Sequence, residues 1–443
     1  MNREMLRLAI PNIISNVSVP LLSSVDTALM GRVSELHIGA VGLGAMLFNF
    51  LYWNFGFLRM GSTGLTAQAF GAGDKTRTAN VLGRAALVAL ALAAILLLFQ
   101  QPIAKAGYYL LSVDDTQVDL VAEYFNIRIW AAPASLLLYA LLGWFFGVQN
   151  AVYPLVLTVF INVVNMAVSY WLVHVQGYGV AGVAYGTLVA QYAGVMLGVG
   201  LWAYRYGGQY FGRLRWKALL YRKALSSFLQ LNSNIFLRTV CLTVAFGMFY
   251  SFSSKEGALI LAVNTVLLQF VNWMSYGIDG FAYASESLVG KYAGRADVGR
   301  TKQAVRLSFG WGGALAILFA AMYALFPDAL LRLFTDQSDV LAAAQPYLPW
   351  LIVFPILGFA SYIWDGIYIG LTAARAMRDS MLLAFGVFLV VFFITRAYGN
   401  HGLWAAMTVF VAARGLVQWA MWHWRDRISH FPTRWMRGAA SSA

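Results

Sequence analysis

Asp26 is the residue whose type and surroundings most directly suggest chemistry. It is the only acid in residues 6–31, an otherwise apolar run with no Lys or Arg after Arg7. A run of this length can cross a bilayer, and a carboxylate inside a spanning helix is costly enough to mark a proton or ion site. Pro20, six residues earlier, removes a backbone hydrogen bond and gives the helix a place to bend. The alternative is an Asp that pairs with a neighbouring helix and a Pro that only kinks.

Several neutral polar residues in the first half of the chain are candidate partners for that carboxyl group. Asn162, Asn165 and Ser169 have the i, i+3, i+7 spacing of one helix face, and Thr187 and Tyr124 lie in neighbouring apolar runs. Amides and hydroxyls can hydrogen-bond a carboxyl group in either protonation state, so this set suits proton exchange. The alternative role is hydrogen bonding between helices.

The second half carries intramembrane charges of its own, including Arg238, Asp279 and Asp365. We expect Arg238 to pair with Asp279 or Asp365, because an unpaired buried charge is very unfavourable. Such a pair is structural. Asp365 lies between Trp364 and Tyr368, so it could instead meet a cationic substrate.

The composition is that of a polytopic membrane protein. Of 443 residues, 60% are hydrophobic and only 11% are charged, against about 25% charged in soluble domains. The net charge of +13 comes mainly from short loops between apolar runs, which favours the positive-inside rule over nucleic-acid binding. Cys241 is the only cysteine and the His residues are scattered, so we expect no disulfide, metal site or cofactor.

The hydrophobic pattern predicts an all-α fold of about twelve transmembrane helices. The apolar runs are residues 6–31, 38–60, 80–101, 119–147, 152–174, 179–203, 226–252, 258–284, 305–326, 343–371, 380–396 and 400–423. Most of the even connections between them are basic, whereas the odd connections are poorer in bases and carry acids. Both termini are therefore expected in the cytoplasm.

An internal repeat divides the chain. Residues 71–74 recur as 294–297, Tyr124 corresponds to Tyr347, and Gly143 and Gly147 correspond to Gly366 and Gly370. We predict two pseudo-symmetric six-helix lobes, with a basic cytoplasmic linker and tail. The N-lobe is 1–204, the linker 205–223, the C-lobe 224–424 and the tail 425–443.

The repeat also indicates a mode of action. An even number of helices per repeat makes the halves parallel, which is typical of alternating-access transporters. The sequence has no P-loop, so an ion gradient would have to supply the energy.

Three segments resemble MATE (multidrug and toxic compound extrusion) transporters. Residues 15–31 are similar to the family's first helix, residues 61–72 to the exit of its second, and residues 279–284 to its DinF branch. The likeness runs from about residue 6 to 424. It implies cation-coupled antiport of organic, often cationic, drugs or toxins by a bacterial inner-membrane protein, which we expect to be monomeric and in contact with membrane lipids.

The resemblance also assigns roles to residues. It implies that Asp26 carries the proton, that its protonation bends the first helix at Pro20, and that Tyr124, Asn165 and Thr187 are its partners. Many relatives have an Asp where this chain has Ser169. A hard cation prefers several oxygen ligands including carboxylates, so the single acid favours H⁺ over Na⁺.

Three alternatives stay open at this point. One is a Na⁺-coupled exporter of the same fold. Another is a lipid-linked glycan flippase, which would need a strongly cationic cavity. The third is an integral membrane enzyme, which would need catalytic spacing of His, Asp or Ser that the sequence lacks.

Overall fold

Every regular element of secondary structure in the described part of the chain is a helix. This computed structural model describes residues 1–30 and 35–429, with side chains for 1–18 and 36–424. No strand occurs within those ranges. The prediction of an all-α protein is confirmed.

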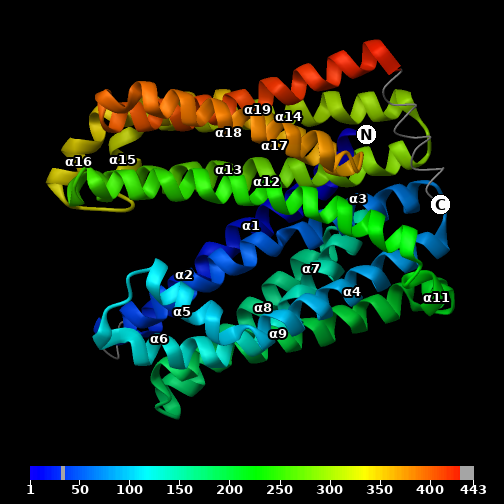
Figure 1. Ribbon diagram of the computed structural model, residues 1–443, viewed down its shortest axis with the longest axis horizontal. Coiled ribbons are helices and arrows are strands. Elements are labelled where there is room, and N and C mark those ends of the chain that lie inside the picture. The colour runs from blue at the N-terminus through cyan, green and yellow to red at the C-terminus, as the bar shows by residue number, and fades with distance from the viewer. Residues whose placement is uncertain (31–34, 430–443) are drawn as a thin grey trace. The chain divides into compact units, whose positions relative to one another are not determined.

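The chain forms two compact units, each with long helices that run side by side (Figure 1). We call Ile14–Phe228 the N-unit, and Met1–Ile13 with the described residues from Leu229 onward the C-unit. Helix α1 (Asn2–Met30) contributes to both units. The other N-unit helices are α2 (Glu35–Trp53), α3 (Phe57–Gly71), α4 (Lys75–Leu98), α5 (Gln100–Leu110), α6 (Asp115–Arg128), α7 (Ala132–Gly147), α8 (Val152–Tyr170), α9 (Gly179–Trp202), α10 (Gly208–Tyr210) and α11 (Trp216–Leu219).

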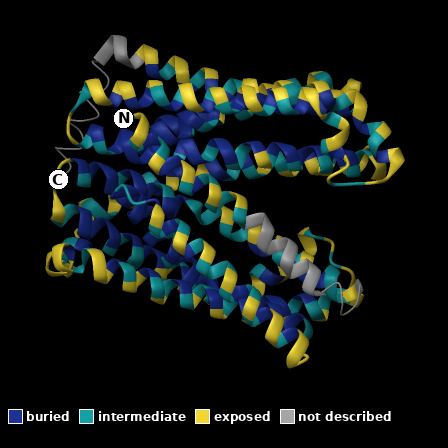
Figure 2. Cartoon of the chain, turned by 180° about the vertical axis from the view of Figure 1, so that it is seen from behind, coloured by how far each residue is buried: buried dark blue, intermediate teal, exposed yellow. Residues whose placement is uncertain are grey.

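The C-unit contains the remaining helices, and in each unit the buried residues lie where these helices meet (Figure 2). They are α12 (Arg222–Lys255, whose first turns belong to the N-unit), α13 (Ala258–Gly294), α14 (Val298–Leu325), α15 (Pro327–Leu331), α16 (Ser338–Ala344), α17 (Leu348–Gly370), α18 (Ala374–Thr395) and α19 (Asn400–Ser429).

Eleven helical segments within the residues described with side chains are long and apolar enough to cross a membrane. They correspond to the second to twelfth predicted runs. The first predicted run, 6–31, extends beyond those residues. These segments identify the chain as a multi-pass membrane protein.

The sequence repeat has matching backbone geometry in the two units. Gly73 and Ala296 have positive φ, 74° and 57°, directly after α3 and α13. Asp74 and Asp297 then cap the next helices by accepting a hydrogen bond from the backbone N–H three residues on, at 2.8 and 2.9 Å. Side-chain caps of this kind satisfy donors that a helix start would otherwise leave unpaired.

The repeated glycines sit at equivalent helix contacts. A Cβ at Gly143 would overlap the carbonyl oxygen of Arg59, and a Cβ at Gly366 would overlap that of Ala282. Absence of a side chain therefore lets α7 pack closely on α3, and α17 on α13. The repeated glycines therefore serve helix packing.

The start of α1 belongs with the C-unit rather than with the helices that follow it. Lys291 Nζ lies 3.0 Å from Glu4 Oε1, and Tyr292 Oη donates to Glu4 Oε2 at 3.1 Å. Partial burial alone would raise the pKa of Glu4, but these neighbours outweigh it and hold the pKa below its ordinary value. The compact units thus differ from the predicted lobes in the placement of Met1–Ile13.

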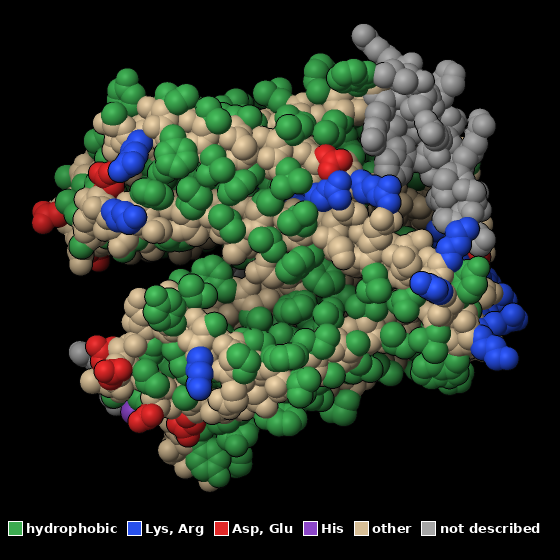
Figure 3. All heavy atoms as spheres, in the orientation of Figure 1, with side chains coloured by type: hydrophobic (Ala, Val, Ile, Leu, Met, Phe, Trp, Pro, Cys, Tyr) green, Lys and Arg blue, Asp and Glu red, His purple; other side chains and the backbone are tan. Residues whose placement is uncertain are grey.

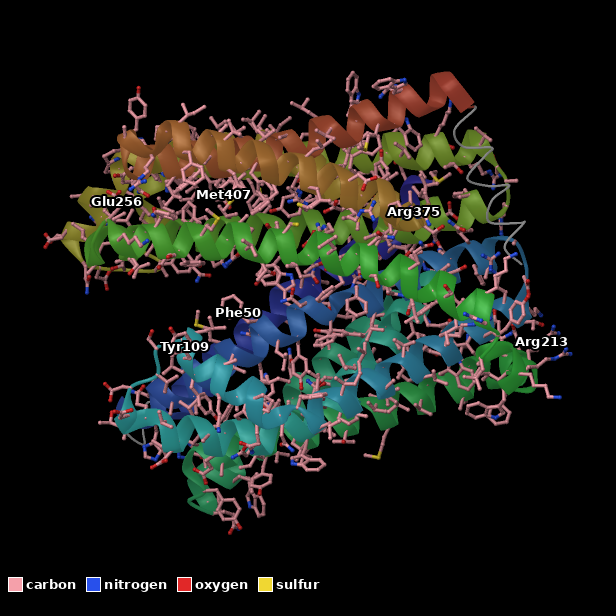
Figure 4. All side chains as sticks on the ribbon, in the orientation of Figure 1. Phe50, Tyr109, Arg213, Glu256, Arg375 and Met407 are labelled. Carbon is pink, nitrogen blue, oxygen red and sulfur yellow. The ribbon has the colours of Figure 1, made fainter. Side chains whose placement is uncertain are left out.

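Charge is distributed unevenly along the N-unit. On the face shown in Figure 3, acidic side chains lie at one end of this unit and most basic ones at the other. Tyr109 and Arg213 mark these opposite ends (Figure 4). In the C-unit, Glu256 and Arg375 likewise lie toward opposite ends (Figure 4).

Candidate functional site

The neutral polar residues predicted on α8 and α9 meet inside the N-unit. Asn165 Nδ2 donates to Thr187 Oγ1 at 2.9 Å, and Thr187 Oγ1 in turn donates to the carbonyl of Val183 at 3.2 Å. Asn165 is 1% exposed and Ser169, one turn on, is fully buried. Gly186 lets α9 approach Ser169 closely, because a Cβ there would collide with its hydroxyl.

This cluster has unused hydrogen-bonding capacity. Asn165 Oδ1 and Ser169 Oγ have no partner among the described residues. A buried polar atom without a partner costs about 1–3 kcal/mol, so such atoms call for an explanation. Both atoms can hydrogen-bond a carboxyl group: the hydroxyl donates to either form, and the amide oxygen accepts from the protonated form.

Tyr124 on α6 packs in a hydrophobic core that includes residues of α9, but its described hydrogen-bond partner is Arg128. Its ring is fully buried against Phe48 and packs in one cluster with Val183 and other α9 residues. Its hydroxyl accepts a hydrogen bond from Arg128 Nη1. No described hydrogen bond joins Tyr124 directly to Asn165 or Thr187.

Asp26 and Pro20 lie outside the residues whose side chains are described. The described part of α1 nevertheless fixes its register on α8. Ser15 Oγ donates to Thr158 Oγ1 at 2.9 Å, and Asn162 Nδ2 donates to the carbonyl of Ser18 at 3.3 Å. The two contacts advance by three residues on α1 and by four on α8, so the two helices run in the same direction over this stretch.

The C-unit contains a buried ionic cluster around Asp365. Nη2 atoms of Arg238 and Arg414 both donate to Asp365 Oδ2, the latter at 2.6 Å, and Gln418 Nε2 donates to Oδ1 at 2.8 Å. All four side chains are at least nine-tenths buried. Of the two partners expected for Arg238, the structure pairs it with Asp365.

Sequence reasoning missed Arg414 and Gln418. They lie inside the predicted apolar run 400–423 and have the i, i+4 spacing of one helix face. That spacing of a cation and an amide inside a spanning run was the available signal. Arg414 also lies 5.7 Å from the ring of Phe410 and 5.8 Å from that of Tyr362, contacts that stabilise a buried cation.

Asp279 takes no described part in the hydrogen bonds around Asp365. It is half-buried on α13, one turn after Ser275, whose hydroxyl donates to Tyr362 Oη at 2.9 Å. The Asp365 cluster joins α12, α17 and α19, so its geometry is that of an interhelical brace.

A metal-binding cluster of three or more His, Cys, Asp or Glu side chains is not found within the described residues. The described cluster on α8 and α9 consists of neutral amide and hydroxyl groups, which can hydrogen-bond a neighbouring titratable group.

Comparisons with known proteins add to this geometry. A sequence model of the MatE family matches residues 11–171 and 235–395, two segments that correspond to the two copies of the repeat. DNA damage-inducible protein F of Escherichia coli (strain K12) is 35% identical over 432 residues, covering 96% of this chain and 93% of that protein.

Two further similarities point the same way. A probable multidrug resistance protein NorM of Synechococcus is 25% identical, with 93% of this chain and 92% of that protein covered. A crystal structure of MATE in the bent conformation has a similar fold, with a TM-score of 0.87 at 18% identity over 99% of this chain and 96% of that one.

Proposed function

The chain belongs to the MatE family of multidrug efflux transporters, and we propose that it is a proton-coupled antiporter that exports organic, often cationic, compounds. Members of this family are secondary transporters, not enzymes. The finer proposal concerns the coupling ion and the residue that carries it, which we take to be H⁺ and Asp26.

The register of α1 on α8 is the observation that supports this assignment. Both helices rise about 1.5 Å per residue, and they start level at the Ser15–Thr158 and Ser18–Asn162 contacts. Continued helical rise brings the backbone of residue 26 to the level of Ser169, near the end of each helix. The unpartnered Asn165 Oδ1 and Ser169 Oγ are then the groups available to a carboxyl at that level.

The composition of the cluster favours H⁺ over Na⁺. Its described members, Asn165, Ser169 and Thr187, are all neutral. A Na⁺ site would need several oxygen ligands and gains from more than one carboxylate. Proton binding requires only one carboxyl group, together with amide and hydroxyl partners that can hydrogen-bond it in either protonation state.

In the proposed cycle, protonation and deprotonation of Asp26 change the hydrogen bonds that its carboxyl group makes. Asp26 takes a proton from outside, and α1 bends at Pro20 as its hydrogen bonds change. In this cycle the substrate binds within the N-unit, and the bending of α1 narrows the space available to it and releases it outward. Deprotonation toward the cytoplasm resets the cycle.

We further propose that both termini face the cytoplasm of a bacterial inner membrane. The basic connections and the basic end of the N-unit support this orientation through the positive-inside rule. Substrate then moves from the cytoplasmic side to the outside.

The experiment is ethidium efflux from cells that lack their own drug exporters. We expect Asp26→Asn to abolish efflux because the amide cannot carry a proton, and Asp26→Glu to retain part of it. Asp336→Asn, which changes an exposed acid, is the matched control and should be fully active. Wild-type efflux from Asp26→Asn would sink the proposal.

A Na⁺-coupled exporter is the nearest alternative. Replacing external Na⁺ by K⁺ at a fixed proton gradient separates the two. The proposal expects unchanged efflux, and a loss of efflux on removing Na⁺ would favour the alternative.

A further inference from the structure

An apolar cavity of about 590 Å³ lies between α4, α7 and α9 in the N-unit. On α4 its lining follows one helix face from Leu82 to Leu90, and on α9 it follows another from Val195 to Trp202. Residues after α9, including Phe211, Leu214 and Trp216, close one end. The cavity is therefore an elongated apolar groove that begins at the linker and continues along membrane-spanning helices.

A basic cavity adjoins this groove at the linker. It has a volume of about 570 Å³ and is lined by Arg215, Trp216, Lys217, Ala218 and Tyr221. Trp216 lines both cavities, so they lie next to each other at that side chain. A third, polar cavity shares Arg215 and adds Lys75 and Arg213 to the cationic surroundings.

The linker has the composition of a segment that lies on an anionic membrane surface. Residues 205–223 contain six Lys or Arg and no acid. Phe211 and Trp216 are 72% and 75% exposed, as is typical of aromatic residues at a lipid headgroup region. Four to eight basic residues next to a spanning helix are characteristic of sites for anionic lipids.

The linker is held in place against α4, so the site is preformed. Arg84 Nη2 donates to the carbonyl of Ala218 at 3.0 Å. A Cβ at Gly83 would press on Leu214 and Leu219, so the glycine makes room for the linker.

One buried donor on the groove lacks an acceptor. Trp202 is 7% exposed, and its Nε1 has no hydrogen-bond partner among the described residues. Trp202 is the last residue of α9, so it lines the groove near its linker end. The ester carbonyls of a phospholipid lie between its phosphate and its acyl chains and would be acceptors near that end.

We propose that this groove binds one anionic phospholipid, with an acyl chain along α4 and α9 and the phosphate at Arg215 and Lys217. The apolar end accounts for a chain, the basic end for a phosphate, and Trp216 spans their junction. The inference is independent of which ion drives transport.

The test is native mass spectrometry of the delipidated full-length protein titrated with phosphatidylglycerol or phosphatidylcholine of the same acyl chains. We expect one phosphatidylglycerol to bind about tenfold more tightly than phosphatidylcholine. Arg215→Gln with Lys217→Gln should remove that preference. Ala86→Trp, which fills the groove, should weaken binding of both lipids; Leu90→Trp, one turn on, replaces it if the first variant does not fold.

Arg295→Gln with Arg375→Gln is the matched control, because it removes two exposed charges from the C-unit. It should leave the preference intact. The proposal is overturned if the wild type does not distinguish the lipids, if this control loses as much preference as the linker variant, or if a groove-filling variant that folds binds normally. Displacement of the lipid by inorganic phosphate at millimolar concentration would overturn it too, since that result assigns the site to free phosphate.

Discussion

Asp365 is surrounded by more positive charge than it neutralises. Two guanidinium groups donate to a single carboxylate, and Gln418 completes its coordination. Removing one member of a buried ionic cluster lowers the free energy of unfolding by far more than the whole cluster contributes to it, because the remaining partners stay buried and unpaired.

Asp365→Asn is therefore expected to destabilise the protein by about 3–5 kcal/mol. It leaves Arg238 and Arg414 without a counter-charge in the interior of the C-unit. Thermal unfolding of the detergent-solubilised protein measures the effect, with Asp336→Asn as a control that removes an exposed acid. Equal stability of the two variants would contradict the role of Asp365 as a brace.

The Glu4–Lys291 contact gives a pH-dependent prediction. Since the pKa of Glu4 is lowered in the folded protein, its stabilisation is present above the unfolded pKa of about 4.3 and is lost as the pH falls through the folded value. Glu4 is 42% exposed, so the contribution should be below about 1 kcal/mol.

Glu4→Gln should accordingly lower the unfolding temperature slightly at pH 7. The gap between variant and wild type should close at an acidic pH below the folded pKa. A gap of the same size at both pH values would show that ionisation of Glu4 is not its cause.

At the scale of helices, positions and spacing were predictable wherever a run was apolar and its charges lay at the ends. The hydrophobic pattern predicts a run at 380–396, which begins after Arg378, whereas α18 starts at Ala374. Arg378 is tolerated inside this helix because it pairs with Asp379 at 2.6 Å and with Asn234 at 2.8 Å. That compensation depends on another helix and cannot be read from local sequence.

The contacts of buried polar residues could likewise be predicted from the sequence only in part. Asn165 and Thr187 could be grouped by helix face, and they do hydrogen-bond. The Asp365 cluster could be predicted only in part, since Arg414 and Gln418 reach it from a helix distant in the sequence. Gln149 and Thr372 occupy equivalent positions in the sequence repeat, and both have a positive φ. The residue types at these positions differ, so this likeness became apparent only in the structure.

Helix packing predicts opposite outcomes for chemically identical substitutions. Gly366→Ala should destabilise the C-unit by about 1–3 kcal/mol, because its Cβ meets the backbone of Ala282, which cannot move aside as a side chain could. Gly386→Ala on α18 meets nothing within 4 Å. It should be neutral or stabilising, since Ala favours helix by about 1 kcal/mol over Gly.

Thermal unfolding of the two glycine variants, side by side, measures this contrast. Gly143→Ala in the N-unit should behave like Gly366→Ala, because its Cβ meets the backbone of Arg59. A tolerated Gly366→Ala would mean that close approach of α17 to α13 is not required.

At the scale of the whole molecule, membership of the MatE family establishes a multidrug efflux transporter with two related halves. The halves share turns and close helix contacts, but their polar interiors differ. In the N-unit, the neutral cluster of Asn165, Ser169 and Thr187 has unpartnered polar atoms. The C-unit has a neutral cluster too, in which Asn264 and Asn400 hydrogen-bond each other, and its Asp365 carboxylate is already paired. We therefore propose that proton coupling belongs to the N-unit.

Transport by the purified protein in liposomes with an imposed proton gradient tests that claim most directly. With K⁺ replacing all Na⁺, the wild type should move ethidium against its gradient as protons move the other way. Asp26→Asn should still bind ethidium but fail to transport it. Gradient-driven transport by Asp26→Asn at the wild-type rate, or a wild type that transports only when Na⁺ is present, would contradict the account.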